Sequence, residues 1–462
     1  MIQDARIRTL NAAPAARDGG YVLYWMQEAQ RAACNHALEY AVREANARRL
    51  PVVAAFGLTA DYPDANARHY AFMLQGLSET AATLADRGVR FVVRRGRPDD
   101  VALRLARKAA LVVCDDSALP LQRQWRRRVA DGAPCAAVEI VTGVVVPLDA
   151  ASTRAEVAAR TLRPRVMRAL PGYLAPLAET AARRDGRGLD LDGQADDIDV
   201  ADAGGPMKAL RLDDGVPPVR RFKGGTAAAR SRLATFVAEH LPAYADGRAE
   251  PGAETSSFLS PYLHFGHIAA LEVALSVEAA DAPPAAREKF LDELVVRREL
   301  AANFVAHTEA YDRYAGVPAW ARATLAAHRG DKRSHLYDRE TLAAAQTHDP
   351  YWNAAMREMT HTGFMHNTMR MYWGKKVIEW SGDPETAFAT LLSLNNRYFL
   401  DGRDANSYAN VAWCFGLHDR PWPERPVFGT VRYMNAAGLD RKYDMAAYLD
   451  LVDRLVRDEH GG

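Results

Sequence analysis

The C-terminal part of the chain is rich in tryptophan. Six of the eight tryptophans lie after residue 319, and Trp373 and Trp380 are seven residues apart in a segment with helical periodicity. Seven residues make about two turns of an α-helix, so the two indoles share one face and lie roughly 10 Å apart along the axis. This spacing suits stepwise electron transfer between indoles. A stripe of core residues that only buries apolar area has the same spacing, so both interpretations stay open.

Two polar segments have the composition of ligand sites. In residues 255–267, TSSFLSPYLHFGH, several hydroxyl side chains precede Pro261 and a helical pattern. Hydroxyls and free backbone amides at the start of a helix suit a pyrophosphate group, and an ordinary N-cap is the alternative. Residues 394–408, LNNRYFLDGRDANSY, concentrate Asn, Asp and Arg in a turn-rich stretch, as a binding loop or a solvated loop does.

The first 145 residues alternate short apolar runs with amphipathic stretches. Helical patterns at 35–48 and 69–87 separate the runs, which predicts an α/β fold with a doubly wound parallel sheet. Neither of the two standard phosphate-binding glycine loops follows the first run. The expected strands are residues 21–26, 51–56, 89–93, 111–114 and 137–140.

The composition changes between residues 185 and 225. This stretch is rich in Gly, Asp and Pro and poor in large apolar residues, which is typical of a connection between domains. Beyond it, apolar residues recur at helical spacing, so we expect a nearly all-helical second half. We therefore predict a Rossmann-like α/β domain over 1–184, a linker over 185–225 and an all-α domain over 226–462.

The bulk composition excludes several classes of protein. A net charge of +1 neither supports nor excludes a nucleic-acid partner. The four cysteines form no CxxC pair, which argues against a disulfide framework, a zinc ribbon or a redox dithiol, and no metal is expected. The chain opens without a signal-peptide pattern, and its apolar runs are shorter than the about 20 residues that span a bilayer. We expect a cytoplasmic protein with no membrane partner.

Seven segments, taken in order, resemble one family. The run HNTMRMYWGKKVIEW followed by LDGRDAN is the most specific. Over about residues 6–448 the chain resembles the photolyase and cryptochrome family. YWGKK and the position of Asn395 follow its class II cyclobutane pyrimidine dimer photolyases, whereas HNTMRM also resembles class I. The segments are YVLYWMQEAQRAACNHAL, SSFLSPYLHFGHI, FLDELVVRRELAANF, DPYWN, TGFMHNTMRMYWGKKVIEW, LNNRYFLDGRDANSY and RYMNAAGLDRKYD.

The resemblance implies a light-driven enzyme that repairs pyrimidine dimers in DNA by electron transfer from photoexcited reduced FAD. FAD is expected in the helical half and damaged double-stranded DNA as the partner of a monomer. Photolyases are among the enzymes that flip their target out of the duplex, so a cavity for an extruded dimer is expected beside the flavin. An antenna chromophore of the deazaflavin or folate type is a further expectation for the sheet domain, with a purely structural role as the alternative.

The resemblance also assigns FAD contacts residue by residue. A cation near the pyrimidine edge of the flavin stabilises the reduced anion, and Arg370, held by Asp401, matches that position. Asn395 matches the amide that tunes which flavin state persists. The full set of expected FAD-binding residues is Tyr244, Ser256, Ser257, Leu259, Ser260, Asn367, Arg370, Asn395, Asp401, Asp404 and Asn406.

Electron transfer and substrate contacts follow from the same resemblance. Trp373, Trp352 and Trp380 match a route that carries electrons from the surface to the flavin. Glu293 is expected to donate a hydrogen bond to the dimer if burial raises its pKa. The expected catalytic residues are Glu293, Met371, Trp413 and Asn395, and the expected DNA-binding residues are Arg248, Arg297, Arg432, Arg441 and Lys442.

Two other functions remain open within the family. A blue-light receptor would bind FAD and signal through partners, but the short end DLVDRLVRDEHGG lacks the long tail often seen on such receptors. An enzyme for the 6-4 lesion would place histidines against the lesion, and His361 and His366 lie near the flavin motif. Arg297 and Ala249 depart from the side chains that some relatives carry at the pocket edge, so details of the substrate contacts stay open.

Overall fold

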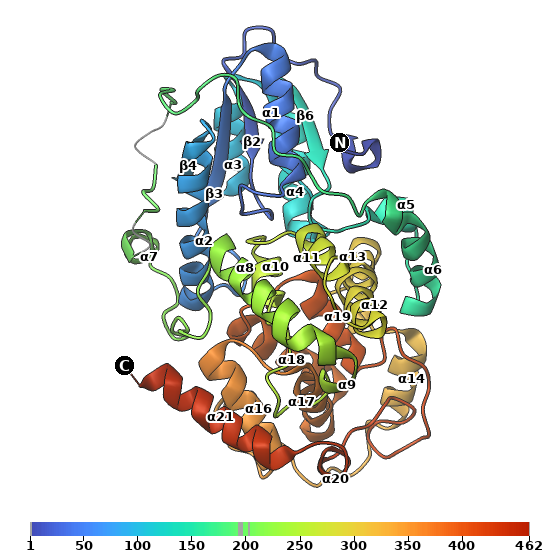
Figure 1. The fold of residues 1–462 in the computed structure, drawn as a ribbon. Coiled ribbons are helices and arrows are strands. Elements are labelled where there is room, and N and C mark those ends of the chain that lie inside the picture. Colours follow the sequence, from blue (N-terminus) through green and yellow to red (C-terminus); the bar gives the residue numbers. More distant parts are fainter. Residues whose placement is uncertain (1, 193–196, 202–203, 462) are drawn as a thin grey trace.

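The computed structural model describes residues 2–192, 197–201 and 204–461. Figure 1 shows a sheet flanked by helices, coloured blue to cyan, above a body of helices coloured lime to red. This order of an α/β half and an all-α half is the fold class that the sequence predicts. The domain boundaries at residues 184 and 225 stay predictions.

The sheet has six strands in the order β1-β6-β5-β2-β3-β4. Strands β2 to β6 are parallel, and each predicted strand agrees with one of them to within two residues at either end. The pattern of apolar residues does not predict β1, a three-residue edge strand that pairs antiparallel with β6. The strands are β1 (Ile7–Thr9), β2 (Tyr21–Trp25), β3 (Val52–Leu58), β4 (Arg90–Arg95), β5 (Ala109–Asp115) and β6 (Ala136–Ile140).

Helices cover both faces of this sheet, because successive residues of a buried strand point to opposite faces. Val22 packs in the cluster that contains α1 and α2, whereas its neighbour Leu23 packs in the cluster that contains α3 and α4. Asn35 caps α1 by accepting the Leu38 backbone N–H at 3.1 Å. The helices are α1 (His36–Arg48), α2 (Ala67–Asp86), α3 (Pro98–Ala106) and α4 (Pro120–Gly132).

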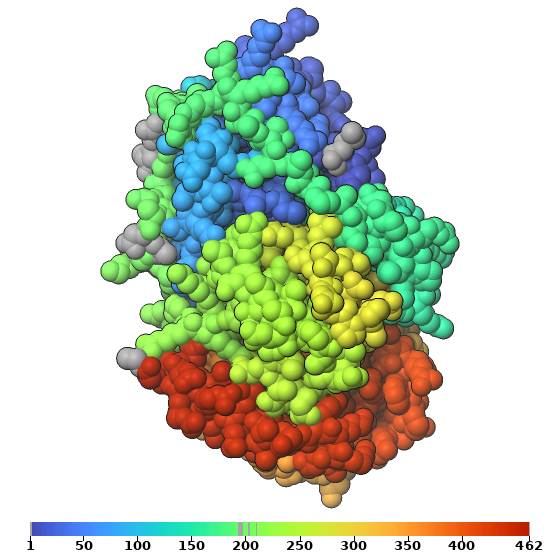
Figure 2. Space-filling model, in the orientation of Figure 1, coloured from blue at the N-terminus to red at the C-terminus, as the bar shows by residue number. Residues whose placement is uncertain are grey.

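The predicted linker contributes to the core more than its composition suggests. Leu191, Val216 and Phe222 are buried, and the described part contains a short helix, α7 (Gly204–Leu210). Residues 193–196 and 202–203 of this stretch lie outside the described residues. Figure 2 shows green residues of the chain lying against the blue surface of the sheet half. The described part of this connection therefore packs against the rest of the molecule.

Helices joined by turns and loops make up the described residues of the second half, which contain no named strand. Two single-turn stretches, Phe236–His240 and Asp292–Arg297, have π-helical hydrogen bonding. Short 3-10 turns occur at Asp4–Arg6, Leu170–Gly172, Leu241–Ala243 and Tyr314–Gly316. The helices from α5 onward, α7 excepted, are α5 (Leu148–Ala151), α6 (Ala159–Ala169), α8 (Thr226–Thr235), α9 (Tyr244–Gly247), α10 (Ser260–His264), α11 (Ala270–Glu278), α12 (Pro284–Leu291), α13 (Arg298–His307), α14 (Ala319–Ala327), α15 (Arg339–Ala343), α16 (Pro350–Thr362), α17 (Asn367–Trp380), α18 (Pro384–Tyr398), α19 (Ala405–Cys414), α20 (Ala436–Asp440) and α21 (Met445–His460).

The core of the helical half lies around α16 to α19. One cluster joins Trp352 of α16, Trp373 of α17, Leu391 of α18 and Val411 of α19. Helices α16 to α19, in the orange to red part of Figure 1, carry the tryptophan-rich and Asn-rich motifs. Within the described residues, no helix combines the length and the apolar character needed to cross a membrane.

Candidate active site

Three helices of the C-terminal half, α17, α18 and α19, enclose a cavity, called here the α17–α19 cavity. Six residues that the sequence singles out as flavin, substrate or electron-transfer residues meet in its wall. The sequence places them in three separate motifs, and the packing of the helices brings them together. The lining residues are Asn367, Arg370, Met371, Trp373, Leu391, Asn395, Phe399, Asn410, Val411, Trp413 and Cys414.

Helix α17 supplies four of these residues. Gly363, in the left-handed region at φ 71°, ends α16, and His366 caps α17. Glycine adopts the left-handed conformation without a Cβ strain penalty, so it commonly ends a helix, and α17 begins four residues later at Asn367. Counted from Asn367, positions i+3 and i+4 are Arg370 and Met371, which share one face of the helix. The helical period therefore aims these side chains into the cavity.

Arg370 is held in one position by four contacts. Its Nη2 donates to both carboxylate oxygens of Asp401, at 3.1 and 3.0 Å, and its Nε donates to the Met365 carbonyl at 3.0 Å. The guanidinium carbon lies 3.9 Å from the centre of the Phe399 ring. The predicted pairing of Arg370 with Asp401 is thus present. It fixes a positive charge at the edge of the α17–α19 cavity.

Asn395 belongs to a chain of amides that reaches the sheet half. Its buried side-chain Nδ2 donates to Asn396 Oδ1 at 3.0 Å, and Asn396 Nδ2 donates to Asp64 Oδ2 at 3.0 Å. A side chain whose neighbours are fixed keeps a single orientation. Asn395 therefore presents a positioned amide to the cavity.

Trp352 contacts both of the other tryptophans of the predicted route, Trp373 and Trp380. The indole N–H of Trp352 donates to the Trp373 carbonyl at 3.0 Å, and the rings of Trp352 and Trp380 lie 5.6 Å apart. Trp380, the last indole of this route, is only 2% exposed. The rings of Tyr337 and His348 pack on Trp380 at 5.4 and 5.2 Å.

The hydroxyl-rich motif lies at a helix start, as predicted. Helix α10 begins at Ser260, and Ser256 and Ser257 lie in the segment directly before it. Leu259 is the N-cap residue of α10 and is buried. Three serine hydroxyls therefore lie just before or at the N-terminus of a helix. The helix has five residues, so its dipole alone contributes little to an anion site.

Asp404 and Asn406 line a different cavity from Asn367, Arg370 and Asn395. They lie at the start of α19 and border the space between the two halves, together with His264. Asp404 caps α19 by accepting the Asn406 and Ser407 backbone N–H groups, and burial raises the pKa of its carboxyl. Burial also lowers the pKa of His264. Of the expected cofactor residues, Asn367, Arg370 and Asn395 line the α17–α19 cavity and Asp404 and Asn406 line the cavity between the halves. The remaining six line neither of these two cavities: Tyr244, Ser256, Ser257, Leu259, Ser260 and Asp401.

Glu293, Tyr244 and Arg248 form one cluster. The Tyr244 hydroxyl donates to Glu293 Oε2 at 2.7 Å, and Arg248 Nη1 lies 2.9 Å from Glu293 Oε1. The Glu293 side chain is 30% exposed, so the burial that the predicted acid role requires is missing. Both contacts fix the orientation of the Glu293 carboxyl group. Thr368 ties this cluster to α17 by donating to the Ala249 carbonyl at 2.8 Å.

The expected DNA-binding residues occupy different surroundings. Arg432 lies beside the α17–α19 cavity, with its guanidinium carbon 5.7 Å from the Trp413 ring centre. Arg297 is 55% exposed, and Arg441 and Lys442 are exposed after α20. The structure therefore places Arg432 against Trp413, which lines the cavity, and Arg248 against Glu293. It leaves Arg297, Arg441 and Lys442 on the surface.

Sequence reasoning missed Lys375, which lies behind Trp413. Its side chain is fully buried, its Nζ donates to the Cys414 carbonyl and it lies 5.1 Å from the Trp413 ring centre. Burial lowers the pKa of this ammonium to about 8. The sequence does contain a signal for this residue, because Lys375 and Lys376 are adjacent in a tryptophan-rich helix. Such a helix has little solvent-facing surface, so at least one of two adjacent lysines is expected to be buried.

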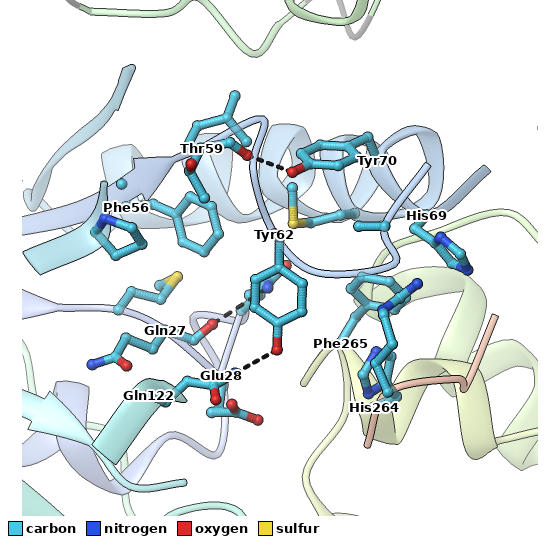
Figure 3. Close-up of a pocket in the computed structure, with 18 of the residues that line it drawn as sticks. Gln27, Glu28, Phe56, Thr59, Tyr62, His69, Tyr70, Gln122, His264 and Phe265 are labelled. Atoms are coloured by element: carbon cyan, nitrogen blue, oxygen red, sulfur yellow. Dashed lines mark hydrogen bonds between the residues drawn. The ribbon is translucent and has the colours of Figure 1, made fainter. Parts of the chain in front are cut away.

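A cavity between the two halves lies at the carboxyl ends of the strands, where the sequence allows an antenna chromophore without naming the residues that line the site. It opens at the carboxyl ends of β2 and β3, and the carboxyl ends of parallel strands are the usual ligand side of such sheets. Asp115 fixes the turn after β2 by accepting the Gln27 and Glu28 backbone N–H groups at 2.9 and 2.6 Å. Figure 3 shows that side chains from both halves line it, among them Phe56, Tyr62, Tyr70, Gln122, His264 and Phe265.

The chain is similar to known proteins along nearly its whole length. A family model described as DNA photolyase matches residues 22–182. A deoxyribodipyrimidine photo-lyase from Methanothermobacter thermautotrophicus is 42% identical over 456 residues, which cover 99% of this chain and 100% of that protein. A deoxyribodipyrimidine photo-lyase from Oryza sativa subsp. japonica is 39% identical over 475 residues, with 98% of this chain and 91% of that protein covered.

Solved structures have the same fold. A bacterial class III photolyase from Agrobacterium tumefaciens superposes with a TM-score of 0.70 at 18% identity, covering 96% of this chain and 86% of that one. A cryptochrome from Synechocystis superposes with a TM-score of 0.69 at 16% identity, covering 95% and 88%. These low identities show the fold, whereas the full-length relatives show the family. The chain belongs to the DNA photolyase family of light-driven DNA repair enzymes, the deoxyribodipyrimidine photo-lyases.

Proposed function

We propose that this enzyme repairs cyclobutane pyrimidine dimers in double-stranded DNA with light and a reduced FAD held by its helical half. One observation carries the proposal. Residues from all three expected roles border the same cavity: Asn367, Arg370 and Asn395 for the flavin, Met371 and Trp413 for the dimer, and Trp373 as the first tryptophan of the electron route. An electron moves between groups that lie close together, so a shared cavity is what such a reaction requires.

The residues of the α17–α19 cavity fit a flavin. Arg370 offers a fixed positive charge that its partner Asp401 orients, and Asn395 offers an amide fixed by Asn396. Bound FAD would supply light absorption and a transferable electron. Ser256, Ser257 and Ser260, before and at the start of α10, would hold the phosphates, and Asp404 and Asn406 would hold the part that reaches the cavity between the halves.

Met371 and Trp413 fit the side of the cavity that an extruded dimer would contact. An indole and a thioether give an apolar, polarisable wall for the faces of two pyrimidines. Arg248 and Glu293, paired at 2.9 Å, would bind the polar edges of the dimer. In this arrangement Glu293 would orient a polar edge of the dimer, because Tyr244 and Arg248 hold its carboxyl group in place.

We assign the chain to class II within its family. Two features support this subclass: the YWGKK motif of α17 and the amide at Asn395. The order of Trp373, Trp352 and Trp380 supports a route that resupplies electrons to the flavin. We further infer that the enzyme acts as a monomer in the cytoplasm.

We also propose that the cavity in Figure 3 takes an antenna chromophore of the deazaflavin or folate type. In the described part of the chain, buried amide atoms of Gln27, Gln30 and Gln122 have no hydrogen-bond partner. Buried polar groups are normally paired, so these amides support a ligand with polar edges. The aromatic rings of Phe56, Tyr62 and others around them support a planar one.

One experiment tests the proposed reaction. Protein reconstituted with FAD and reduced is mixed with duplex oligonucleotides that carry either one cyclobutane dimer or one 6-4 lesion, in the dark and under near-UV or blue light. Restoration of adjacent thymines is measured by chromatography. Repair of the cyclobutane dimer under light alone is expected. Repair of the 6-4 lesion instead, or binding of FAD without repair of either lesion, would contradict the proposal.

A further inference from the structure

Two indoles border the α17–α19 cavity, and their surroundings differ. Trp373 and Trp413 both line it. Trp373 is joined to Trp352 by a hydrogen bond, and its ring centre lies 6.2 Å from that of Phe399. Trp413 lies near the C-terminal end of α19. Either indole is chemically able to give an electron to an oxidising group in this cavity, so some feature must select between them.

Cations surround Trp413. Lys375 Nζ lies 5.1 Å from its ring centre and the guanidinium carbon of Arg432 lies 5.7 Å from it. Lys375 is fully buried, and its hydrogen bond goes to the neutral carbonyl of Cys414. In the part of the chain that the structure describes, no carboxylate oxygen lies within the 4.0 Å of an ion pair with it. Asp419 acts on this charge only from beyond ion-pair distance, so no direct ion pair neutralises Lys375 in the described residues.

The adjacent lysine provides a contrast on the same helix. Lys376 also lies over a tryptophan, with its Nζ 5.7 Å from the Trp380 ring centre. Lys376 Nζ donates to Glu379 Oε2 at 2.7 Å, so its charge is balanced by a carboxylate. Trp380 belongs to the tryptophan route, and among the described residues no ring contact joins Trp413 to that route. The unbalanced charge thus lies at the indole outside the route.

Loss of an electron turns an indole into a cation. A fixed positive charge nearby opposes that change, and the opposition is strong in a buried site, where the effective dielectric constant is low. Attraction between Lys375 and the electron-rich ring face also stabilises neutral Trp413. Both effects make Trp413 harder to oxidise than Trp373.

We propose that Lys375, with Arg432, is a positioning residue that keeps Trp413 from being oxidised, so that electrons enter the cavity through Trp373 alone. Trp413 would then remain a neutral wall for the dimer in every turnover. The inference rests on the proposed function for its purpose, but the difference between the two indoles is a property of the chain itself. A purely structural Lys375 that only satisfies the Cys414 carbonyl predicts no such difference.

The first test needs no cofactor. FAD-free protein is exposed to azide radicals, which take one electron from tryptophan and become azide. The electron vacancy migrates among nearby rings before oxygen reacts with it, so peptide mass spectrometry reports how easily each tryptophan is oxidised. We expect Lys375→Met to raise the share of oxidised Trp413 at least fivefold over the parent. Lys376→Met is the matched control and should leave that share unchanged.

A second substitution keeps the test valid if the buried change impairs folding. Arg432→Gln removes the more distant cation from a partly exposed position, so it should raise the share of oxidised Trp413 by a smaller factor, about twofold. Circular dichroism establishes which variants are folded. An unchanged Trp413 share in every folded variant would overturn the proposal.

The second test uses protein loaded with oxidised FAD, whose excited-state lifetime reports electron transfer from a neighbouring indole. Trp373→Phe should lengthen this lifetime several-fold. Adding Lys375→Met should shorten it again, and adding Trp413→Phe to that double variant should restore the long value. A double variant as long-lived as Trp373→Phe alone would refute the role of Lys375. Failure of the parent to bind FAD would instead refute the proposed function, and the azide oxidation of FAD-free protein would then decide the role of Lys375.

Discussion

The indole N–H of Trp352 donates a hydrogen bond to the backbone carbonyl of Trp373 at 3.0 Å. This contact joins α16 to α17. It holds the indole of Trp352, the second tryptophan of the proposed route, against the backbone of Trp373, the first. On its other side Trp352 meets Trp380 at a ring distance of 5.6 Å. Electron transfer weakens steeply with distance, so the middle indole is the one whose loss should interrupt the route.

Trp352→Phe should slow light-driven reduction of bound FAD at least tenfold, because phenylalanine keeps the packing but is much harder to oxidise. Dimer repair by enzyme that is already reduced should stay within twofold of the parent. Photoreduction is followed by flavin absorbance and repair by chromatography. Trp320→Phe, a tryptophan of α14 outside the route, is the control. Equal photoreduction in Trp352→Phe and the parent would contradict the route.

Asp401→Asn should weaken FAD binding about tenfold or more. The substitution leaves Arg370, whose side chain is 15% exposed, without its bidentate carboxylate partner, and an unpaired charge in such a site costs about 2 kcal/mol or more. FAD retention is measured by the absorbance ratio after gel filtration. Asp213→Asn breaks the exposed pair with Arg397 and should have no effect. Full FAD content in Asp401→Asn would show that the pair does not position Arg370 for the cofactor.

Glu293→Gln should lower the rate of dimer repair by reduced enzyme at least tenfold while FAD content stays unchanged. The amide cannot form the ion pair with Arg248 and can only partly replace the acceptor for the Tyr244 hydroxyl. Single-turnover repair under saturating light measures the effect. Glu288→Gln, an exposed residue of α12, is the matched control. A repair rate like that of the parent would remove Glu293 from the substrate site.

Glu299 should make stability depend on pH. It is 1% exposed, accepts the Val146 N–H at 2.8 Å, and burial raises its pKa from 4.5 to about 8. Between these two values the folded state binds more protons than the unfolded state, so the free energy of unfolding falls as pH rises.

Glu299→Gln keeps the acceptor and removes the ionisation. Its free energy of unfolding should match that of the parent near pH 4.5 and exceed it by a few kcal/mol, on the order of 3, at pH 8.5. Urea unfolding at the two pH values measures the difference. Glu278→Gln, exposed at the end of α11, should give the same difference at both. A parent that is relatively more stable at the higher pH would contradict the assignment.

The double substitution of Arg441 and Lys442 by Ala should weaken binding to damaged and undamaged duplex alike. Both side chains are exposed, and each phosphate contact contributes about 0.9 to the slope of log affinity against log salt. We expect the slope to fall by about 1.8, measured by fluorescence anisotropy. Arg183 and Arg187 changed to Ala on the sheet half should leave it unaltered. The same slope in the Arg441 and Lys442 variant would place the DNA elsewhere.

Local pattern was enough to predict most of the fold. Buried strands such as residues 52–58 are short apolar runs, and helices such as α2 alternate apolar and polar residues with a helical period, so each is encoded by neighbours in the sequence. The edge strand β1 was missed because its three residues are partly exposed and obtain their conformation from pairing with β6. The sequence alone was therefore enough to predict the α/β half and the helical half. It was also enough to identify the motifs that carry the family resemblance.

Contacts between distant segments decided the rest. Glu293 became a paired carboxylate because Tyr244, 49 residues away, donates to it, and Trp380 became buried because Tyr337 and other rings cover it. Lys375 became a buried charge because α19 supplies only a neutral carbonyl at its amine. Periodicity shows which face of a helix is apolar but not which side chain the next helix brings against it. Side-chain partners, and with them charge, exposure and redox character, arise only when the helices pack.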